Sequence, residues 1–323
     1  MRNPTGGVPP GAAPAVAGAG VGHPRRILLE ANIERPDIAA IVAQVVDACA
    51  SRDISVRMLE GTSGNVATGT GVEAVPDTPL AAEGCELVLV LGGDGTFLRA
   101  CQYAHAADVP VLGVNLGHVG FLAESEASSL RGVVEQIADR DYRVVERMTV
   151  EATVMHGEKV LGQDWALNEV SIEKVSRQGV LEASVEIDGR PVSDYGCDGM
   201  LVSTPTGSTA YAFSAGGPIV WPELDAILVV PNNAHALFAR PMVVAPSSRV
   251  AVETGVRSGP AVVVLDGRRL VDTPPGSRVE VIRGRRPVKW VRLDESPFTD
   301  RLVTKFELPV TGWRGRSAAR PLP

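Results

Sequence analysis

Hydrophobic positions in the first part of the chain alternate between short continuous runs and helical spacing. Residues 27–30 begin with three successive apolar residues and predict a strand, residues 36–50 carry apolar side chains three and four positions apart, and residues 56–59 are expected to form a short strand. Buried parallel strands have continuous apolar runs because helices cover both faces of their sheet. Runs at 86–91 and 109–115 repeat this pattern, which predicts an alternating α/β domain.

Segments between and after these runs are expected to be helices or long connections. We expect helices that end near residue 106 and that span about 126–140. The connection at 60–84 shows no clear periodicity, and a connection of this length is uncommon unless it is mobile or functional, so we expect a mobile segment such as a lid. Residues 1–24 are mostly Gly, Ala, Pro and Val, which predicts a disordered tail.

The pattern changes near residue 144, where helical spacing nearly disappears. Residues 144–173, 180–188 and 200–203 alternate or are β-branched, and similar stretches continue to residue 283. Such spacing predicts an all-β second domain, and helical spacing returns at 297–306 in a segment expected to pack back on the first domain. The fold class is therefore α/β plus all-β, with the tail at 1–24 followed by an α/β domain at 25–145, an all-β domain at 146–286 and a returning C-terminal segment at 287–323.

Composition narrows the possible partners. The chain has 323 residues, 45% of them hydrophobic, a formal net charge of -7 and a pI near 5.4. These values argue against a broad nucleic-acid or anionic-lipid surface and favour small anionic ligands. Its cysteines lack C-x-x-C spacing, which favours buried reduced thiols over disulfides or a zinc site and therefore a cytoplasmic location, and the histidines show no metal-ligand spacing. The cysteines are Cys49, Cys85, Cys101 and Cys197.

A glycine turn follows the apolar run at 86–91 and presents one carboxylate. The turn is Gly92-Gly93-Asp94-Gly95-Thr96, and Thr96 is a candidate cap for the helix that follows. Glycines let backbone N–H groups approach an oxyanion that a helix N-terminus also attracts. Asp94 would then position a magnesium ion or accept a proton, since an unpaired carboxylate among phosphates is disfavoured. The alternative is an Asp that only stabilises a tight turn.

A second group of polar residues lies in the predicted all-β domain. Asn168 and Glu169 interrupt an apolar strand, where each costs free energy unless it is paired. Sugar hydroxyls would pair them, and the backbone of a neighbouring loop would do so equally well. Residues 196–218 are rich in hydroxyl groups and glycines and include Tyr211, which suits a loop around a polar ligand. A Ser/Thr-rich turn with Tyr211 in the core is the alternative.

These motifs together resemble those of bacterial NAD kinases, in particular of the actinobacterial type, from about residue 26 to residue 313. The motifs that carry the resemblance occur in order along the chain: Gly92–Thr96, Asn115–Phe121, Asn168-Glu169, and Cys197-Asp-Gly with Thr204–Tyr211. The resemblance implies a Rossmann-like first domain that binds nucleotide, a β-sandwich second domain that binds NAD, and a homo-oligomer, expected to be a tetramer. It also implies phosphorylation of the adenosine 2'-hydroxyl of NAD by ATP, or by polyphosphate, with Mg²⁺ carried on the donor phosphates.

The resemblance further implies roles for matching residues. Asp94 would accept the proton of the 2'-hydroxyl, and Gly95 and Arg99 would line the diphosphate and donor-phosphate crevice. The phosphate loop would be Gly92, Gly93, Gly95 and Thr96. The other NAD contacts would be Asn168 and Glu169 at the ribose or metal-phosphate region, Asp198 toward an NAD that often belongs to the adjoining subunit, the adenine-side residues Thr209, Ala210, Tyr211 and Ser214, and Arg268 as a less constant contact.

Two other functions fit part of this pattern. A lipid kinase of the diacylglycerol type has a similar glycine turn, but no basic or amphipathic docking surface is evident in the sequence. A non-catalytic dinucleotide sensor would use the same pockets with residues 60–84 as a signalling loop. Formation of NADP from NAD, ATP and Mg²⁺ distinguishes an enzyme from a sensor.

Overall fold

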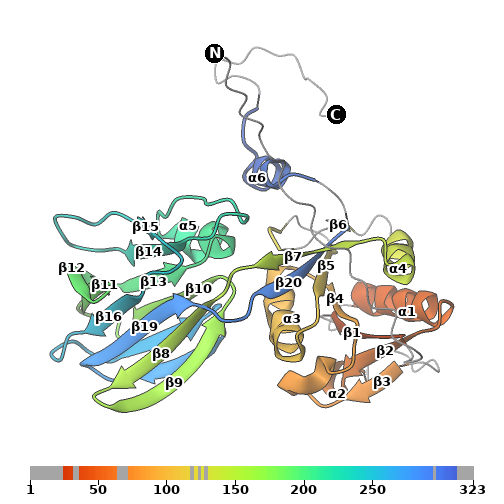
Figure 1. Cartoon of the computed structure of the whole chain (residues 1–323), viewed down its shortest axis with the longest axis horizontal. Coiled ribbons are helices and arrows are strands. Elements are labelled where there is room, and N and C mark those ends of the chain that lie inside the picture. Colours follow the sequence, from red (N-terminus) through yellow and green to blue (C-terminus); the bar gives the residue numbers. More distant parts are fainter. Residues whose placement is uncertain are drawn as a thin grey trace, which may run out of the picture.

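The computed structural model describes residues 25–31, 36–63, 72–116, 120–122, 125–126, 130–293 and 296–310. Figure 1 shows two domains side by side, with one helix above their junction. The tail expected at 1–24 lies outside the described residues. No helix in the described ranges is long and apolar enough to cross a membrane.

The first domain is built on a mostly parallel sheet with helices on both faces. Its described strands follow the order β3-β2-β1-β4-β5-β20-β7, and β6 pairs with the end of β5. The strands are β1 (Arg25–Ala31), β2 (Ile54–Leu59), β3 (Val72–Val75), β4 (Leu87–Leu91), β5 (Val111–Asn115), β6 (Ser125–Glu126), β7 (Arg143–Arg147) and β20 (Val288–Arg292). The helices are α1 (Pro36–Ala50), α2 (Glu60–Ser63), the 3-10 turn η1 (Pro79–Ala82), α3 (Asp94–Ala107) and α4 (Leu130–Asp139).

Successive residues of the central strands face opposite sides of this sheet. Leu87, Leu89 and Leu91 of β4 pack in the core formed with α1 and α4, whereas Val88 and Val90 pack with α3 and η1. Because both faces are covered, every residue of β4 is buried. This explains the continuous apolar run at this position in the sequence.

The second domain is a sandwich of two antiparallel sheets. The sheet orders are β15-β14-β13-β10-β17-β18 and β12-β11-β16-β19-β8-β9, and one hydrophobic core draws side chains from both. The first sheet contains β10 (Glu169–Lys174), β13 (Gly199–Ser203), β14 (Ile227–Asn232), β15 (Met242–Val244), β17 (Ala261–Leu265) and β18 (Arg269–Thr273). The second contains β8 (Val150–His156), β9 (Lys159–Ala166), β11 (Leu181–Ile187), β12 (Arg190–Cys197), β16 (Val250–Thr254) and β19 (Ser277–Arg283). The α/β plus β-sandwich fold class is thus confirmed.

The chain passes between the domains twice. It leaves the first sheet after β7 and returns after β19 as β20, which is parallel to β5 and antiparallel to β7. The last described helix, α6 (Phe298–Phe306), follows β20 and places its rings against both domains. The C-terminal segment therefore does more than return to the first domain, because α6 also contacts the second.

Two expectations about local structure were wrong. Residues 72–75, inside the expected loop at 60–84, form β3, which pairs with the edge strand β2, and η1 packs in the core beside α3. Because β3 is short and largely exposed, its sequence lacks the alternation of hydrophobic and polar residues that would have predicted a strand. Thr96 does not cap α3: Gly93 is the N-cap, the helix begins at Asp94, and Thr96 lies in the first turn.

All four cysteines are buried and free, as expected from their spacing. Their burial raises the pKa of the thiols, and for Cys49 and Cys197 the pKa rises to about 11. A thiol with a raised pKa forms little of the reactive thiolate at neutral pH. These cysteines act as small core residues.

Replacement of Gly113 by Ala should destabilise the first domain. A Cβ on Gly113 of β5 would lie 2.7 Å from the Phe97 ring of α3 and 3.1 Å from the carbonyl oxygen of Leu122. Phe97 is fully buried, so the strain costs about 1–3 kcal/mol. Denaturant unfolding measures this loss, and Gly259→Ala is the control because a Cβ there meets no atom within 4 Å. Equal stability of the two variants would contradict the packing described.

Candidate active site

The glycine turn between β4 and α3 places one carboxylate at the start of a helix. Gly92 directly follows β4, and a Cβ there would lie 2.9 Å from Oγ1 of Thr96, so a larger residue would strain the turn. The carbonyl of Gly93 accepts the first helical hydrogen bond, from Phe97, at 3.1 Å. A Cβ on Gly93 or on Gly95 would have no other atom within 4 Å. The N-terminus of α3 is therefore approachable by a ligand along these glycines.

The Asp94 carboxylate is held by the loop that follows the neighbouring strand β5. The backbone N–H of Phe121 donates to Oδ2 of Asp94 at 3.3 Å, and the N–H of Leu122 donates to Oδ1 at 3.1 Å. A Cβ on Gly120 would collide with Oδ1 of Asp94, so only glycine fits there. The sequence predicted that the loops after these two parallel strands face one crevice, and this is confirmed for the described residues 120–122, whereas residues 117–119 lie outside them.

Asp94 lines a pocket between the two domains. The pocket has a volume of about 250 Å³. Its lining brings together five of the sequence-predicted residues, Asp94, Asn168, Glu169, Thr209 and Ala210, and adds Leu98, Phe121, Leu122, Thr206, Asp266 and Gly267. None of these lining side chains is basic. The side-chain oxygens of Asp94, Asn168, Glu169 and Asp266 instead make the pocket wall rich in hydrogen-bond acceptors.

Two buried oxygens of this pocket have no hydrogen-bond partner in the described part of the chain. They are Oδ1 of Asn168 and Oε2 of Glu169, and both residues are only 5% exposed. A buried acceptor without a donor costs about 1–3 kcal/mol. A ligand that brings hydroxyl or amine donors would remove this cost.

The loop after β13 fixes Asn168 from the other side. Thr204 donates its hydroxyl to the carbonyl of Leu167, and Ser203 donates its hydroxyl to the carbonyl of Asn168. A Cβ on Gly207 would collide with the carbonyl oxygen of Asn168. The 3-10 turn η3 (Thr206–Thr209) is consequently pressed against the start of β10, which brings Thr209 to the pocket wall.

Asp266 is a second buried acid close to Glu169. Asp266, in the hairpin turn after β17, accepts the backbone N–H groups of Leu167 and Asn168 at 3.0 and 2.7 Å and pairs with Arg269 at 2.9 Å. Burial raises the pKa of Asp266, although Arg269 opposes this. Burial, and then the proximity of Asp266, raises the pKa of Glu169 to about 8. Glu169 is therefore mostly protonated at neutral pH in the free protein.

Sequence reasoning named Arg268 in this turn but missed Asp266 as a site residue. The available signal was an acid that directly follows the apolar run 261–265. Its function is to position Asn168 through the backbone, which no pattern along the chain reveals. The sequence also contained no sign that Glu30 is buried: it is 1% exposed near the end of β1, and burial raises its pKa to about 7, although it does not line the pocket.

Six residues predicted to contact NAD, Gly95, Arg99, Asp198, Tyr211, Ser214 and Arg268, are not among the residues that line this pocket, and neither are Gly92, Gly93 and Thr96 of the predicted phosphate loop. Arg99 lies 3.4 Å from Glu30 and 3.0 Å from Asp77. Asp198 pairs with Lys174 and accepts a hydrogen bond from Asn233, which lower its pKa. The roles of these residues stay predictions.

Three of these residues, Tyr211, Ser214 and Arg268, lie in a short helix and in a hairpin turn of the second domain. The Tyr211 hydroxyl accepts from Asn232 at 3.0 Å. Tyr211 and Ser214 begin and end the short helix α5 (Tyr211–Ser214). Arg268 lies in the hairpin turn close enough to Glu30 to lower that residue's pKa.

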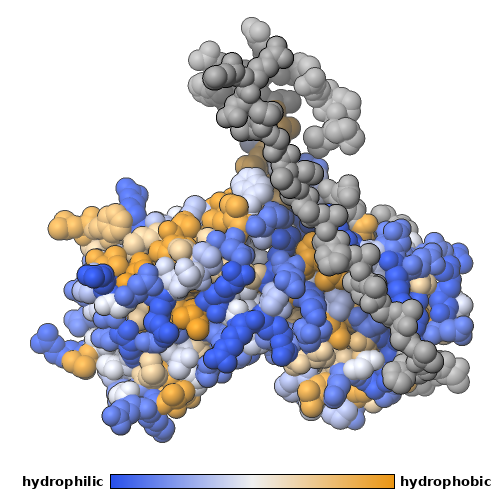
Figure 2. Space-filling model, viewed as in Figure 1, coloured by the Kyte–Doolittle hydropathy of each residue, from blue (hydrophilic) through white to orange (hydrophobic). Residues whose placement is uncertain are grey.

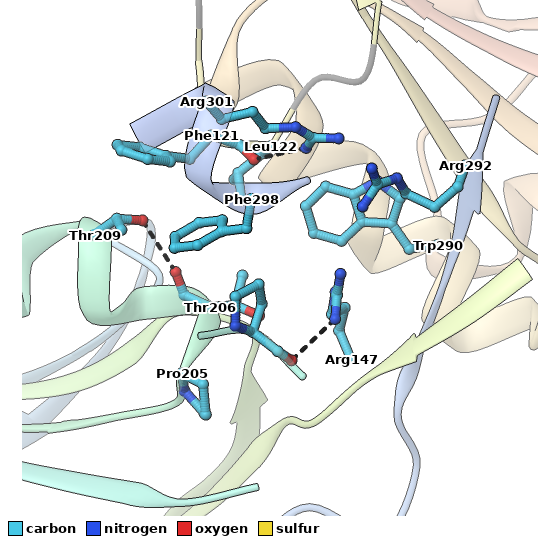
Figure 3. A pocket seen from close by; sticks show the side chains of 11 residues that line it. Phe121, Leu122, Arg147, Pro205, Thr206, Thr209, Trp290, Arg292, Phe298 and Arg301 are labelled. Atoms are coloured by element: carbon cyan, nitrogen blue, oxygen red, sulfur yellow. Dashed lines mark hydrogen bonds between the residues drawn. The ribbon is translucent and has the colours of Figure 1, made fainter. Parts of the chain in front are cut away.

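A smaller cavity of about 20 Å³ adjoins the pocket. Figure 3 shows it between α6, the loop at 205–209 and the strands that cross between the domains. Four residues line both spaces: Phe121, Leu122, Thr206 and Thr209. Its other side carries the guanidinium groups of Arg147, Arg292 and Arg301. Acceptors thus gather on one side of the 121–122 wall and cations on the other.

Comparison with known proteins places the chain in a family. Residues 62–142 match the model of the ATP-NAD kinase N-terminal domain, and residues 167–293 match that of the ATP-NAD kinase C-terminal domain. The chain is 66% identical to an NAD kinase of Corynebacterium glutamicum over 73% of its own length and 81% of the relative. It is 55% identical to an NAD kinase of Rhodococcus erythropolis over 91% of its length and 98% of the relative.

Solved structures share the fold at low sequence identity. The crystal structure of yeast NADH kinase complexed with NADH superposes with a TM-score of 0.80 at 20% identity, covering 90% of each chain. An NAD kinase from Archaeoglobus fulgidus in complex with ATP gives a TM-score of 0.67 at 23% identity and covers 88% of this chain and 100% of that one. At this identity the structures establish the fold.

The two-domain fold and the matched family models define a phosphotransferase. The high sequence identity to the two NAD kinases, over most of the chain, then identifies the particular family. The chain belongs to the NAD kinase family, and NAD kinase is its activity.

Glu169 should make the folded protein less stable as the pH rises. Its pKa is raised from 4.5 to about 8 on folding, so its favourable contribution is present below about pH 4.5 and is lost as the pH rises through 8. Glu169→Gln should therefore reduce the fall in unfolding free energy between about pH 5 and pH 8.5 by on the order of 2 kcal/mol. Denaturant unfolding without nucleotide measures it.

The exposed Glu158 provides the control, because Glu158→Gln removes a carboxylate that is not buried. That variant should keep the wild-type pH dependence. Parallel curves for wild type and Glu169→Gln would show that Glu169 ionises normally in the folded protein.

Proposed function

We propose that the pocket beside Asp94 binds the adenosine ribose of NAD with its 2'-hydroxyl toward that carboxylate, and that the enzyme transfers the terminal phosphoryl group of ATP, or of polyphosphate, to it. The observation that carries the proposal is that the Asp94 carboxylate and the unpartnered oxygens of Asn168 and Glu169 line one pocket. A ribose offers hydroxyl donors to these acceptors. A phosphate group would be repelled by the Asp94 carboxylate.

Asp94 is the group that accepts the proton in this proposal. The 2'-oxygen forms a bond to the terminal phosphorus, the bond from that phosphorus to the bridging oxygen breaks, and the hydroxyl proton passes to Asp94. ADP, or the shortened polyphosphate, leaves. Two backbone N–H groups fix the carboxylate, and an ionised carboxylate keeps further lone pairs to accept a hydroxyl.

The phosphate chain would lie along the glycines rather than inside the acidic pocket. Gly93 and Gly95 leave open space at the start of α3, where unpaired N–H groups and the helix dipole favour an anion. Gly92 and Thr96 shape the turn beneath it. Arg99 would help if it exchanged Asp77, an exposed partner, for a phosphate oxygen.

Magnesium fits this arrangement as an ion carried by the donor. No group of three or more acidic, His or Cys side chains in the described ranges could hold a metal ion. Asn168 and Glu169 offer two unpartnered oxygens, and Mg²⁺ takes few protein ligands when phosphates supply the others. When bound, the ion would neutralise charge on the donor phosphates.

A cytoplasmic homotetramer completes the proposal. Apolar side chains are exposed around β15, with Phe238 51% and Val243 53% exposed, and Figure 2 shows orange surface over this part of the second domain. Exposed apolar surface of this kind favours association. Asp198, outside the pocket of its own subunit, would then be free to reach NAD in an adjoining one.

Asp94→Asn should abolish most turnover while NAD still binds. The amide keeps the size of the side chain but does not accept a proton, so kcat should fall by roughly 10²- to 10⁴-fold. NADP formation from NAD, ATP and Mg²⁺ measures turnover, and calorimetry measures NAD binding. Near-normal turnover would exclude Asp94 as the base, and a wild-type protein that binds NAD without making NADP would be a sensor.

Asn168→Ala should weaken NAD binding more than it slows chemistry. The variant removes an acceptor that lacks a partner in the free protein, so its loss is felt when ribose hydroxyls are bound. The dissociation constant of NAD should rise by roughly 5- to 30-fold, the effect of a hydrogen bond of about 1–2 kcal/mol. Gln163→Ala, on an exposed position of β9, is the control. Unchanged NAD affinity in Asn168→Ala would show that the ribose lies elsewhere.

A further inference from the structure

The C-terminal helix α6 lies across the junction of the two domains (Figure 1). Phe306 contacts Phe121 of the first domain at a ring distance of 5.5 Å and Phe213 of the second at 4.6 Å. Phe298 does the same with Phe121 at 6.1 Å and Trp221 at 5.3 Å. One short helix thus joins the domains through aromatic side chains.

The residue that α6 contacts in the first domain is the one that holds Asp94. Phe121 donates its backbone N–H to Oδ2 of Asp94, and its carbonyl accepts a long hydrogen bond of 3.5 Å from Arg301 of α6. Figure 3 shows Arg301 over Phe121 and Leu122, with Phe298 beside them. The Phe121 residue therefore connects α6 to the carboxylate, and its side chain and both of its backbone polar groups are engaged.

The helix is held by partly buried contacts. None of its side chains is fully buried, and its apolar residues Phe298, Leu302, Val303 and Phe306 stay partly exposed. Aromatic pairs contribute about 0.5–1.5 kcal/mol each. Elements with few buried contacts open locally at a small cost in free energy. Docking of α6 is thus sensitive to the relative positions of Phe121 and Phe213, which belong to different domains.

We infer that α6 is a strap that positions the catalytic base: Phe306 and Arg301 hold the Phe121 segment so that its N–H fixes Asp94, and they do so only when both domains present their rings to α6. Arg301 and Phe306 are positioning residues in this inference, since they act through Phe121. The inference deepens the proposed function and rests on Asp94 as the proton acceptor. A carboxylate displaced by about 1 Å loses up to about 10²-fold in rate.

Phe306→Ala and Arg301→Ala test this role by steady-state kinetics. Each should lower kcat by roughly 10- to 100-fold, while KM for NAD changes by less than about 3-fold, because neither residue lines the acidic pocket. Phe306→Tyr and Arg301→Lys should restore most of the activity. Thr304→Ala, on the exposed face of α6, is the matched control and should keep wild-type kcat.

Measurement of unfolding and of NAD-binding stoichiometry separates positioning from misfolding. If Phe306→Ala binds one NAD per site and still loses kcat, the loss is in positioning. If Phe306→Ala and Arg301→Ala keep kcat within 2-fold, or if Thr304→Ala loses as much as they do, the strap is overturned. Loss of binding-competent sites in proportion to the loss of kcat would also overturn it, since α6 would then serve only stability.

The double variant Asp94→Asn/Phe306→Ala distinguishes failure of the strap from failure of the proposed function. If Phe306 acts through Asp94, the double variant should be no slower than Asp94→Asn alone, because the group being positioned is already disabled. Additive losses would overturn the strap and leave Asp94 as the base. Full turnover in Asp94→Asn alone would overturn the proposed function and the strap together.

Discussion

Two backbone hydrogen bonds, from Phe121 and Leu122 to the Asp94 carboxylate, are the interaction on which the site depends. They join the turn after β4 to the segment after β5, and they set the carboxylate at the helix N-terminus that, in the proposed function, would attract the donor phosphates. Gly120 makes them possible, because a side chain there would occupy the position of the carboxylate. The parallel pairing of β4 and β5 provides the register that brings the two segments together.

The second domain completes the pocket with groups that are costly in the free protein. Asn168 and Glu169 keep unpartnered oxygens, and Asp266 raises the pKa of Glu169 further. Such cost persists because the β-sandwich around it is well packed, with the core residues of β10 and β17 buried. A ligand that donates hydrogen bonds would recover this free energy, so in the proposed function the cost of the unpaired oxygens would become affinity for a polyhydroxylated substrate.

The pocket is lined by residues of both domains, so its shape depends on how the two domains are connected. β20 returns to the first sheet between β5 and β7, and α6 then contacts Phe121 and Phe213 from opposite domains. The Arg147, Arg292 and Arg301 side chains line the adjoining cavity, which shares Phe121 and Leu122 with the pocket. In the proposed function, the acidic pocket would disfavour phosphate and leave the helix start for it.

The sequence by itself determined the elements and the chemistry of each motif. Apolar runs and helical spacing are local signals, and they specified β4, α3 and the change to an all-β domain, while the Gly92–Thr96 turn predicted an anion site beside a single acid. Tertiary structure alone decided what depends on distant segments: the burial of Asp266 beneath Asn168, the charge of Glu30 at the end of β1, and the contact of α6 with Phe121. Residues separated by tens of positions or more meet there, and no pattern along the chain encodes their distance or the loss of water between them.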